Sequence, residues 1–323
     1  MRLCIVIVNY RTPGLVLDAI DSLEGQLEAG LDEIVVVDND SGDASAEQLE
    51  RAIAARGLTR FCRVLRSGRN AGFAAGNNIG IRSVDANYYM LLNSDTIVRK
   101  GAVRELLAQM QQHPFVGIAG PRIEWPDGRP QASCFRDHSP VSELLSAAKT
   151  GPLNSLLRDF DVAMPISDEP CEAEWLSFAC VLIRREVFER VGLLDEGYFM
   201  YFEDSDFCRA ARAAGFRVWY FPDARVVHLH GGSSAFSRAA GAMKKPNAAR
   251  KSKGGPRAPR YLYASRTRYF HKGYGMLGVL MANAMWCVGH SVARSRELIG
   301  RKTPEARDKE WLDNWTDAFR LQP

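Results

Sequence analysis

Long apolar runs alternate with amphipathic stretches through the first 120 or so residues. The runs Arg2–Val8, Glu33–Asp38 and Tyr88–Leu92 are apolar at their centres, which is typical of strands buried on both faces of a parallel sheet. After the first run, apolar residues recur at helical spacing, namely at Leu15, Leu17, Ile20 and Leu23. This alternation predicts an α/β fold with a Rossmann-like, mostly parallel sheet flanked by helices.

The second half of the chain predicts further strands around a loop-rich segment. Residues 121–129 predict a strand–turn–strand unit with Asp127-Gly128 at its turn, and Trp175–Ile183 predicts one buried strand. Residues 137–170 contain several prolines and acids, so we expect an irregular segment over the mouth of a site. Residues 216–222 predict one more strand.

Three carboxylates stand among aromatic residues in the stretch Tyr198–Arg209. Glu203, Asp204 and Asp206 precede apolar residues at helical spacing, so we expect Asp204 to be the N-cap and Asp206 to lie in the first turn. A helix start explains one or two acids, but a third acid among Phe and Tyr rings is costly unless its charge has a role. The stretch therefore predicts an active-site acid.

Polar residues also follow the predicted strands at their carboxyl ends. Asn9 and Tyr10 follow the first strand, Asp38 closes the second, and Asn93 and Asp95 close the third of these. Open α/β sheets bind their ligands at this edge. The sequence therefore predicts a ligand site that gathers these residues.

Five motifs, taken in chain order, carry a resemblance to a known family. They are Val8-Asn9-Tyr10, Val37-Asp38-Asn39, Asn70–Asn77, Leu92–Asp95 and Glu203–Asp206. They cover roughly residues 1–235, with a weaker likeness over Tyr261–Gly275. The chain resembles glycosyltransferase family 2, in particular the rhamnosyltransferase-like and galactofuranosyltransferase-like members that build bacterial surface polysaccharide. The resemblance implies a GT-A fold, inverting transfer from a nucleotide-diphosphate sugar, and a divalent metal, Mg²⁺ or Mn²⁺.

The resemblance also implies which residues surround the donor. Asp38 matches the acid that accepts a hydrogen bond from the nucleoside. Gly72 and Gly76 match a turn where the backbone passes close to the nucleotide, which requires small residues. The other residues expected around the donor nucleotide are Asn9, Tyr10, Asn70, Asn77 and Asn93.

Metal and acceptor residues follow from the same resemblance. Asp95 and His228 match the metal ligands, with His230 as the alternative histidine. One or two protein ligands suffice for such a metal because phosphate and water complete its coordination. Asp204 matches the general base that removes a proton from the acceptor hydroxyl, and Glu203 is expected to contact an acceptor hydroxyl.

The composition changes beyond residue 235. Residues 236–260 are basic and rich in Gly, Pro and Ala, which is typical of a loop that is either solvated or in contact with phosphate or acidic lipid. Gly273–Val292 is largely apolar and predicts a packed or interfacial helix rather than a membrane span. Arg266 and Arg268 are candidates to clamp a diphosphate.

These assignments divide the chain into four parts. They are a nucleotide-sugar-binding half (1–125), an acceptor-binding and catalytic half (126–235), a basic loop (236–260) and a helical C-terminal extension (261–323). The net charge of +4 is modest, and no nucleic-acid partner is expected. Seven cysteines without Cys-x-x-Cys or a signal peptide predict reduced thiols in a cytoplasmic protein. The basic loop and the Gly273–Val292 helix predict peripheral contact at the inner face of the plasma membrane.

The predicted function is transfer of a sugar, with dTDP-rhamnose as the donor that the subfamily suggests, to a glycan or polyprenyl-diphosphate-linked acceptor. The family usually has glycine where this chain has Phe178, so the acceptor is left open. A sugar-phosphate nucleotidyltransferase is one alternative, but the segment Val8–Pro13 lacks its glycine-rich basic loop. The other is an inactive nucleotide- or glycan-binding module, against which the intact Asp38, Asp95 and Asp204 argue.

Overall fold

The computed structural model describes residues 1–229, 258–300 and 310–320. The predicted basic loop, 236–260, therefore lies almost entirely outside the described residues, and so does His230.

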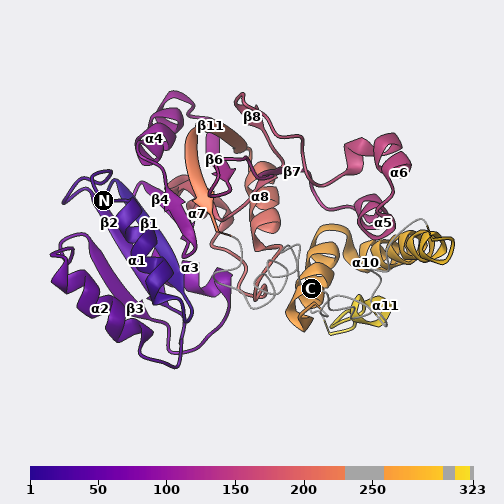
Figure 1. Ribbon diagram of the computed structural model, residues 1–323, viewed down its shortest axis with the longest axis horizontal. Coiled ribbons are helices and arrows are strands. Elements are labelled where there is room, and N and C mark those ends of the chain that lie inside the picture. The colour runs from indigo at the N-terminus through magenta and orange to yellow at the C-terminus, as the bar shows by residue number, and fades with distance from the viewer. Residues whose placement is uncertain (230–257, 301–309, 321–323) are drawn as a thin grey trace.

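A large mixed sheet forms the centre of the molecule (Figure 1). Its strands run in the order β3-β2-β1-β4-β10-β6-β11-β5, and β8 pairs with β11. Their bounds are β1 Leu3–Asn9, β2 Asp32–Asp38, β3 Cys62–Arg66, β4 Tyr88–Asn93, β5 Thr96–Val98, β6 Val116–Glu124, β8 Cys171–Glu172, β10 Cys180–Arg184 and β11 Arg217–His228. Strands β3, β2, β1 and β4 are parallel, β6 and β11 are parallel to each other, and β10 is antiparallel to both of its neighbours. The predicted mostly parallel sheet is confirmed.

Helices cover both faces of this sheet. Alternate residues of β1 explain how two cores arise, because Leu3 and Ile5 face a cluster with α1, α2 and α4, whereas Cys4 and Val6 face one with α3, α7 and α8. The helices are α1 Pro13–Ser22, α2 Ser45–Ala55, α3 Phe73–Arg82, α4 Ala102–Gln112, α5 Pro140–Ala148, α6 Gly151–Leu156, α7 Arg185–Val191, α8 Glu203–Ala213, α10 Arg260–Leu298 and α11 Glu310–Asp313.

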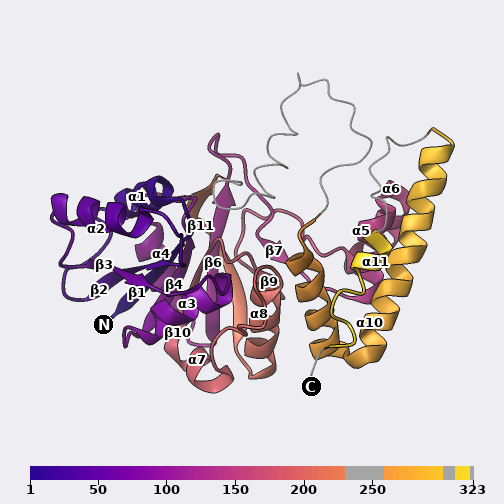
Figure 2. The same cartoon turned by 90° about the horizontal axis from the view of Figure 1, so that it is seen from below.

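A long C-terminal helix stands beside the sheet domain (Figure 2). Helix α10 has 39 residues and bends at Gly275, whose φ of 66° and ψ of −170° interrupt the helical backbone. A third apolar cluster, which includes Tyr198, Tyr269, Phe270 and Val279, joins it to the rest of the chain. The predicted helical C-terminal extension is confirmed.

The structure differs from the prediction in two segments: one contains helices where an irregular segment was expected, and one predicted strand is divided in two. Residues 137–170 contain α5, α6 and a short 3-10 helix at Arg158–Phe160, and α5 begins with a capping box between Ser139 and Ser142. The single strand predicted at Trp175–Ile183 is instead two strands. β9 (Trp175–Leu176) pairs with β7 (Cys134–Phe135), and β10 enters the main sheet.

Two other strand predictions are corrected at their ends. The unit predicted at 121–129 has its turn at Asp127-Gly128, where the N–H of Trp125 donates to the carbonyl of Arg129 at 2.8 Å. Its first strand is the end of the long strand β6, and its second is only an isolated antiparallel bridge between Glu124 and Pro130. The strand predicted at 216–222 continues through Pro222 to His228, with a register shift between Phe221 and Arg225. That shift tolerates Pro222, which has no N–H to donate to the ladder.

Candidate active site

The carboxyl ends of β1 and β2 bring Asn9 and Asp38 side by side, because the parallel register pairs these two residues. Asn9 Nδ2 donates to Asp38 Oδ1 at 2.7 Å, and Ser41 Oγ donates to the same oxygen at 2.6 Å. The Ser41 backbone N–H donates to Asp38 Oδ2 at 3.2 Å. The carboxylate of Asp38 is thus fixed in orientation at the edge of the sheet, while Tyr10 next to it is 37% exposed.

Asn39 and Asn70 join this edge to the start of α3. Asn39 Nδ2 donates to Asn70 Oδ1 and to the carbonyl of Gly72, each at 3.0 Å. Asn70 Oδ1 also accepts from the Gly72 N–H at 3.1 Å. The sequence placed Asn39 in a motif without giving it a role and did not single out Ser41, although both lie in the polar turn after β2.

Gly72, Gly76 and Asn77 make close contacts within the protein that the sequence did not predict. A Cβ at Gly72 would lie 2.0 Å from the carbonyl oxygen of Phe199, and one at Gly76 would lie 2.9 Å from the side chain of Val8. Asn77 donates to the carbonyl of Phe73 within its own helix. Close approach to other parts of the protein therefore requires glycine at residues 72 and 76, and their contact with a nucleotide stays a prediction.

We expect Gly72→Ala to destabilise the protein more than Gly192→Ala does. The two glycines share nearly the same backbone conformation, with φ 93°, ψ −175° and φ 84°, ψ −172°, but a Cβ at Gly192 would meet nothing within 4 Å. Backbone strain is therefore matched, and only Gly72→Ala adds overpacking, typically about 1–3 kcal/mol. Urea denaturation measures the difference, and equal free energies of unfolding for the two variants would contradict the packing explanation.

Asp95 and His228 meet where β4 and β11 end. His228 Nε2 is 3.2 Å from Asp95 Oδ1, and Asp95 is 1% exposed. The N–H of Leu229 donates to the carbonyl of Asp95 at 2.9 Å, which holds the two strand ends together. A carboxylate oxygen beside an imidazole nitrogen is a donor set that suits a divalent metal. Among the described residues, no group of three or more His, Cys, Asp or Glu side chains lies close enough to hold a metal ion. Asp95 and His228 are therefore the two candidate metal ligands at this position.

The acidic stretch begins α8 through two residues in a left-handed conformation. Tyr201 and Phe202 have φ values of 72° and 70°, which is rare for aromatic residues and marks a strained turn. Phe202 is the N-cap, so the prediction that Asp204 caps the helix is wrong. Glu203 and Asp204 instead occupy the first turn. The strained turn thereby sets where both carboxyl groups point.

Burial changes the acidity of both groups. Burial raises the pKa of Asp204 to about 6, and the N–H groups of Ser205, Asp204 itself and Phe178 oppose this by stabilising the carboxylate. Burial, and then the charge of Asp204, raise the pKa of Glu203 well above its ordinary value. Glu203 is 6% exposed, and its Oε2 has no hydrogen-bond partner among the described residues. Burial and the charge of Asp204 thus favour the protonated form of Glu203, whereas three backbone N–H groups favour the carboxylate form of Asp204.

Backbone contacts connect this pair to the Asp95 end of the sheet. Phe178 supplies an N–H to Asp204, and the carbonyl of the next residue, Ala179, accepts from the Asn93 N–H at 2.9 Å. The Phe178 side chain itself is 3% exposed and packs against Phe207. The ring that departs from the family pattern is therefore part of the core.

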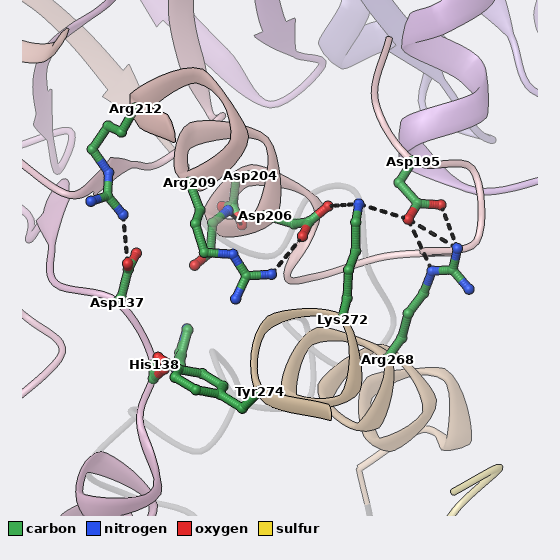
Figure 3. A network of polar contacts seen from close by, with 11 residues as sticks. Asp137, His138, Asp195, Asp204, Asp206, Arg209, Arg212, Arg268, Lys272 and Tyr274 are labelled. Atoms are coloured by element: carbon green, nitrogen blue, oxygen red, sulfur yellow. Dashed lines mark hydrogen bonds and ion pairs between the residues drawn. The ribbon is translucent and has the colours of Figure 1, made fainter. Parts of the chain in front are cut away.

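Asp206 belongs to an ion-pair network between α8 and α10 (Figure 3). Its carboxylate accepts from Arg209 at 2.8 Å and from Lys272 at 2.5 Å. Lys272 also reaches Asp195 at 3.1 Å, and Arg268 contacts the same carboxylate with two nitrogens. These contacts support the predicted structural role of Asp206.

The proposed diphosphate clamp is contradicted by this network and by the neighbouring one. Arg268 is committed to Asp195, as Figure 3 shows. Arg266 is 6% exposed and donates to Glu143 at 2.8 Å and to Asn283 at 2.7 Å. Both guanidinium groups thus bind carboxylate or amide groups of the protein itself.

The aromatic residues before Glu203 pack on the C-terminal helix. Phe199 and Tyr201 contact the ring of Tyr261, and Phe202 contacts Tyr269 and His138. Burial, followed by the charges of two nearby arginines, lowers the pKa of His138 to about 4, so its imidazole is neutral. Sequence reasoning missed His138, because a single histidine in a loop-rich segment carries no signal.

Comparisons with known proteins identify the family of this chain. The family model described as Glycosyl transferase family 2 matches residues 4–192. The low-salt glycan biosynthesis hexosyltransferase Agl10 of Haloferax volcanii is 29% identical over 235 residues, which cover 70% of this chain and 66% of that protein. The N-acetylglucosaminyl-diphospho-decaprenol L-rhamnosyltransferase of Mycobacterium tuberculosis is 31% identical over 186 residues, which cover 51% of this chain and 58% of that protein. Each alignment covers less than two thirds of the relative's length.

A solved structure shares the fold. GalNAc-T7 with UDP, GalNAc and Mn²⁺ aligns with a TM-score of 0.59 at 17% identity, covering 94% of this chain and 55% of that one. This likeness confirms the predicted GT-A fold. Because the family model spans more than half of the sequence, the chain belongs to glycosyl transferase family 2.

Proposed function

We propose that this protein is an inverting glycosyltransferase that moves a sugar from a nucleotide-diphosphate sugar to a glycan or lipid-linked glycan acceptor in bacterial surface polysaccharide synthesis. The observation that carries the proposal is the gathering of three acidic sites at one edge of the sheet. They are the Asp38 cluster, the Asp95–His228 pair and the Glu203–Asp204 pair. The rhamnosyltransferases among the relatives make dTDP-rhamnose the first donor to test.

Each site has one task in this proposal. Asp38, held by Asn9 and Ser41, accepts a hydrogen bond from the nucleoside. Asp95 and His228 would hold a divalent metal, Mg²⁺ or Mn²⁺, which when bound stabilises the negative charge that develops on the departing diphosphate. Glu203, whose pKa is raised by burial and then by the charge of Asp204, makes a hydrogen bond with an acceptor hydroxyl.

Asp204 acts as the general base. Its carboxylate takes the proton of the acceptor hydroxyl while that oxygen forms a bond to C1 of the sugar. The bond from C1 to the phosphate oxygen breaks on the opposite face, and the nucleoside diphosphate leaves with that electron pair. One base is sufficient, because attack from the opposite face inverts C1 in a single displacement.

A scan of nucleotide-sugars tests the proposed function. The purified protein is incubated with each nucleotide-sugar and Mn²⁺, with and without a glycan or lipid-linked acceptor, and release of the nucleoside diphosphate is measured. We expect acceptor-stimulated release from one donor or a few related ones. Release of pyrophosphate from a nucleoside triphosphate and a sugar phosphate would instead identify a nucleotidyltransferase, and binding without release would identify an inactive module.

We expect Asp38→Asn to raise the KM for the donor about ten- to a hundredfold while changing kcat little. The contact with the nucleoside exists in both ground and transition states, and a hydrogen bond to a charged group is typically worth about 1.5–3 kcal/mol. Steady-state kinetics at saturating acceptor measure the effect. Ser41→Ala is the control, since it removes one donor to Asp38 but keeps its charge. An unchanged donor KM in Asp38→Asn would remove Asp38 from the nucleoside site.

A further inference from the structure

The second half of α10 exposes a continuous apolar face. Leu277, Leu280, Met281, Val288, Val292 and Leu298 recur at helical spacing and are between 37% and 88% exposed. We call these six residues the apolar stripe. No charged residue lies between them on the same face of the helix, because the cations nearest to it, Arg294 and Arg296, fall on its two flanks by helical position. Contiguous exposed apolar surface of this kind marks a binding surface.

The opposite face of the same half-helix is packed against the protein. Val279, Ala282 and Trp286 are buried there, and Gly289 lies so close to α5 that a Cβ would be 2.3 Å from the carbonyl oxygen of Leu144. Figure 2 shows α5 and α11 on one side of α10, which forms the outer edge of the molecule. The apolar stripe therefore faces away from the core and is held in that orientation.

Arg294 and Arg296 border the stripe, Glu297 pairs with Arg294, and the sequence that precedes them is strongly basic. From Ala224 to Arg296 the sequence contains 14 Lys and Arg residues and no Asp or Glu. An anionic partner is favoured by such a segment, whereas a second copy of the chain would bring two positive segments together. An apolar helix face bordered by cations is the pattern of a helix that lies in the interface of an anionic bilayer.

We propose that the apolar stripe docks the protein on an anionic lipid bilayer, with the second half of α10 lying in the plane of the interface. By length and composition α10 is the one helix among the described residues that could cross a membrane, but 39% of its most apolar window is buried in the protein. Asn283 on the buried side binds Arg266 and the carbonyl of Asn314. A crossing would break these contacts, so the helix lies on the surface. This inference deepens the proposed function, because a lipid-linked acceptor is presented at the same surface.

Vesicle co-sedimentation of the full chain tests the proposal. The vesicles are phosphatidylcholine alone, or phosphatidylcholine with phosphatidylglycerol, and contain neither acceptor nor nucleotide. We expect binding to the anionic vesicles that weakens as salt is raised. The double variant Leu280→Asp with Val288→Asp should lower the bound fraction about tenfold or more, since it replaces two apolar contacts with charges. Leu31→Asp is the control, because Leu31 is 47% exposed and directly precedes β2. In Figure 1, β2 and α10 lie on opposite sides of the molecule.

Three results would overturn the proposal. They are equal vesicle binding by the stripe variant and the wild type, no vesicle binding by the wild type, and a wild-type dimer that the stripe variant converts to a monomer in light scattering. Circular dichroism and nucleotide affinity verify that the variant is folded. Transfer to a soluble acceptor is measured in parallel. If the stripe variant still transfers sugar to a soluble acceptor but no longer binds vesicles, the result supports the docking surface. If the wild type binds vesicles but transfers no sugar, the result counts against the proposed function alone.

Discussion

Asp204→Asn is expected to lower kcat by about 10²–10⁴-fold while the affinity for the donor stays unchanged. The substitution keeps the shape of the side chain and the hydrogen bond from the Ser205 N–H, but it removes the group that accepts the proton. General-base catalysis typically contributes a factor of this size. Steady-state kinetics give kcat, and titration of the nucleoside diphosphate gives the affinity of the donor site.

Two neighbouring acids serve as matched controls. Glu203→Gln keeps the shape of the side chain and a group that can hydrogen-bond the acceptor, so it should cost less in kcat and mainly raise the KM for the acceptor. Asp206→Asn weakens the ion pairs to Arg209 and Lys272 and should chiefly lower Tm. If Asp204→Asn turns over near the wild-type rate while Glu203→Gln is inactive, the base is Glu203.

The pH dependence supplies a second readout for the same residue. A base with a pKa of about 6 is protonated below that pH, so kcat/KM should fall on the acid side and this fall should disappear in Asp204→Asn.

The free energy of unfolding should depend on pH in the opposite direction from kcat/KM. A carboxyl whose pKa rises from 3.8 to about 6 on folding binds its proton more tightly in the folded state, so its contribution is lost as pH rises through this range. Asp204→Asn should therefore have a Tm at pH 8 no lower than that of the wild type.

Asp95→Ala should abolish turnover and the metal dependence of nucleotide binding without unfolding the protein. Loss of metal stabilisation at the leaving group costs several kcal/mol, or ~10³-fold or more in rate. The backbone hydrogen bond from Leu229 uses the carbonyl of residue 95 and survives the substitution. Calorimetry of nucleoside diphosphate binding with and without Mn²⁺ measures the effect independently of catalysis.

EDTA and a histidine variant complete this test. His228→Gln should weaken the metal dependence less than Asp95→Ala does, because it retains the carboxylate of the pair. Full activity of the wild type in EDTA would exclude the metal role of Asp95. The same result would leave the assignment of Asp204 untouched, since proton transfer to a carboxylate does not require the metal.

The parallel half of the fold was predictable because its signals are local. Each of β1, β2 and β4 is an apolar run that ends in a polar residue, and parallel pairing then places Asn9 beside Asp38. The later strands were harder to predict. Trp175–Leu176 and Cys180–Arg184 lie in one largely apolar stretch of the sequence, yet they belong to different sheets. Only tertiary pairing separates them.

In the candidate active site, too, the features that depend on tertiary contacts were not predictable from local sequence. Asp95 and His228 were predicted from a resemblance, and the structure brings them together. The reason for Gly72 was not predictable, because its constraint is the backbone of Phe199, which is distant in the chain. The aromatic residues before Glu203 indicated an unusual environment for the acids. Their rings pack on α10, and no local sequence pattern indicates where that helix lies.

The bend at Gly275 divides α10 into halves with different neighbours. In the first half, Ser265 donates to the carbonyl of Met200 at 3.0 Å, Tyr261 packs on Tyr201, and Lys272 binds Asp206. This half supports the strained turn that orients Glu203 and Asp204, and the second half carries the apolar stripe. A chain truncated before residue 258 would therefore lose the buttress of its catalytic turn together with its exposed apolar face. Substitutions beyond Gly275 separate the two effects.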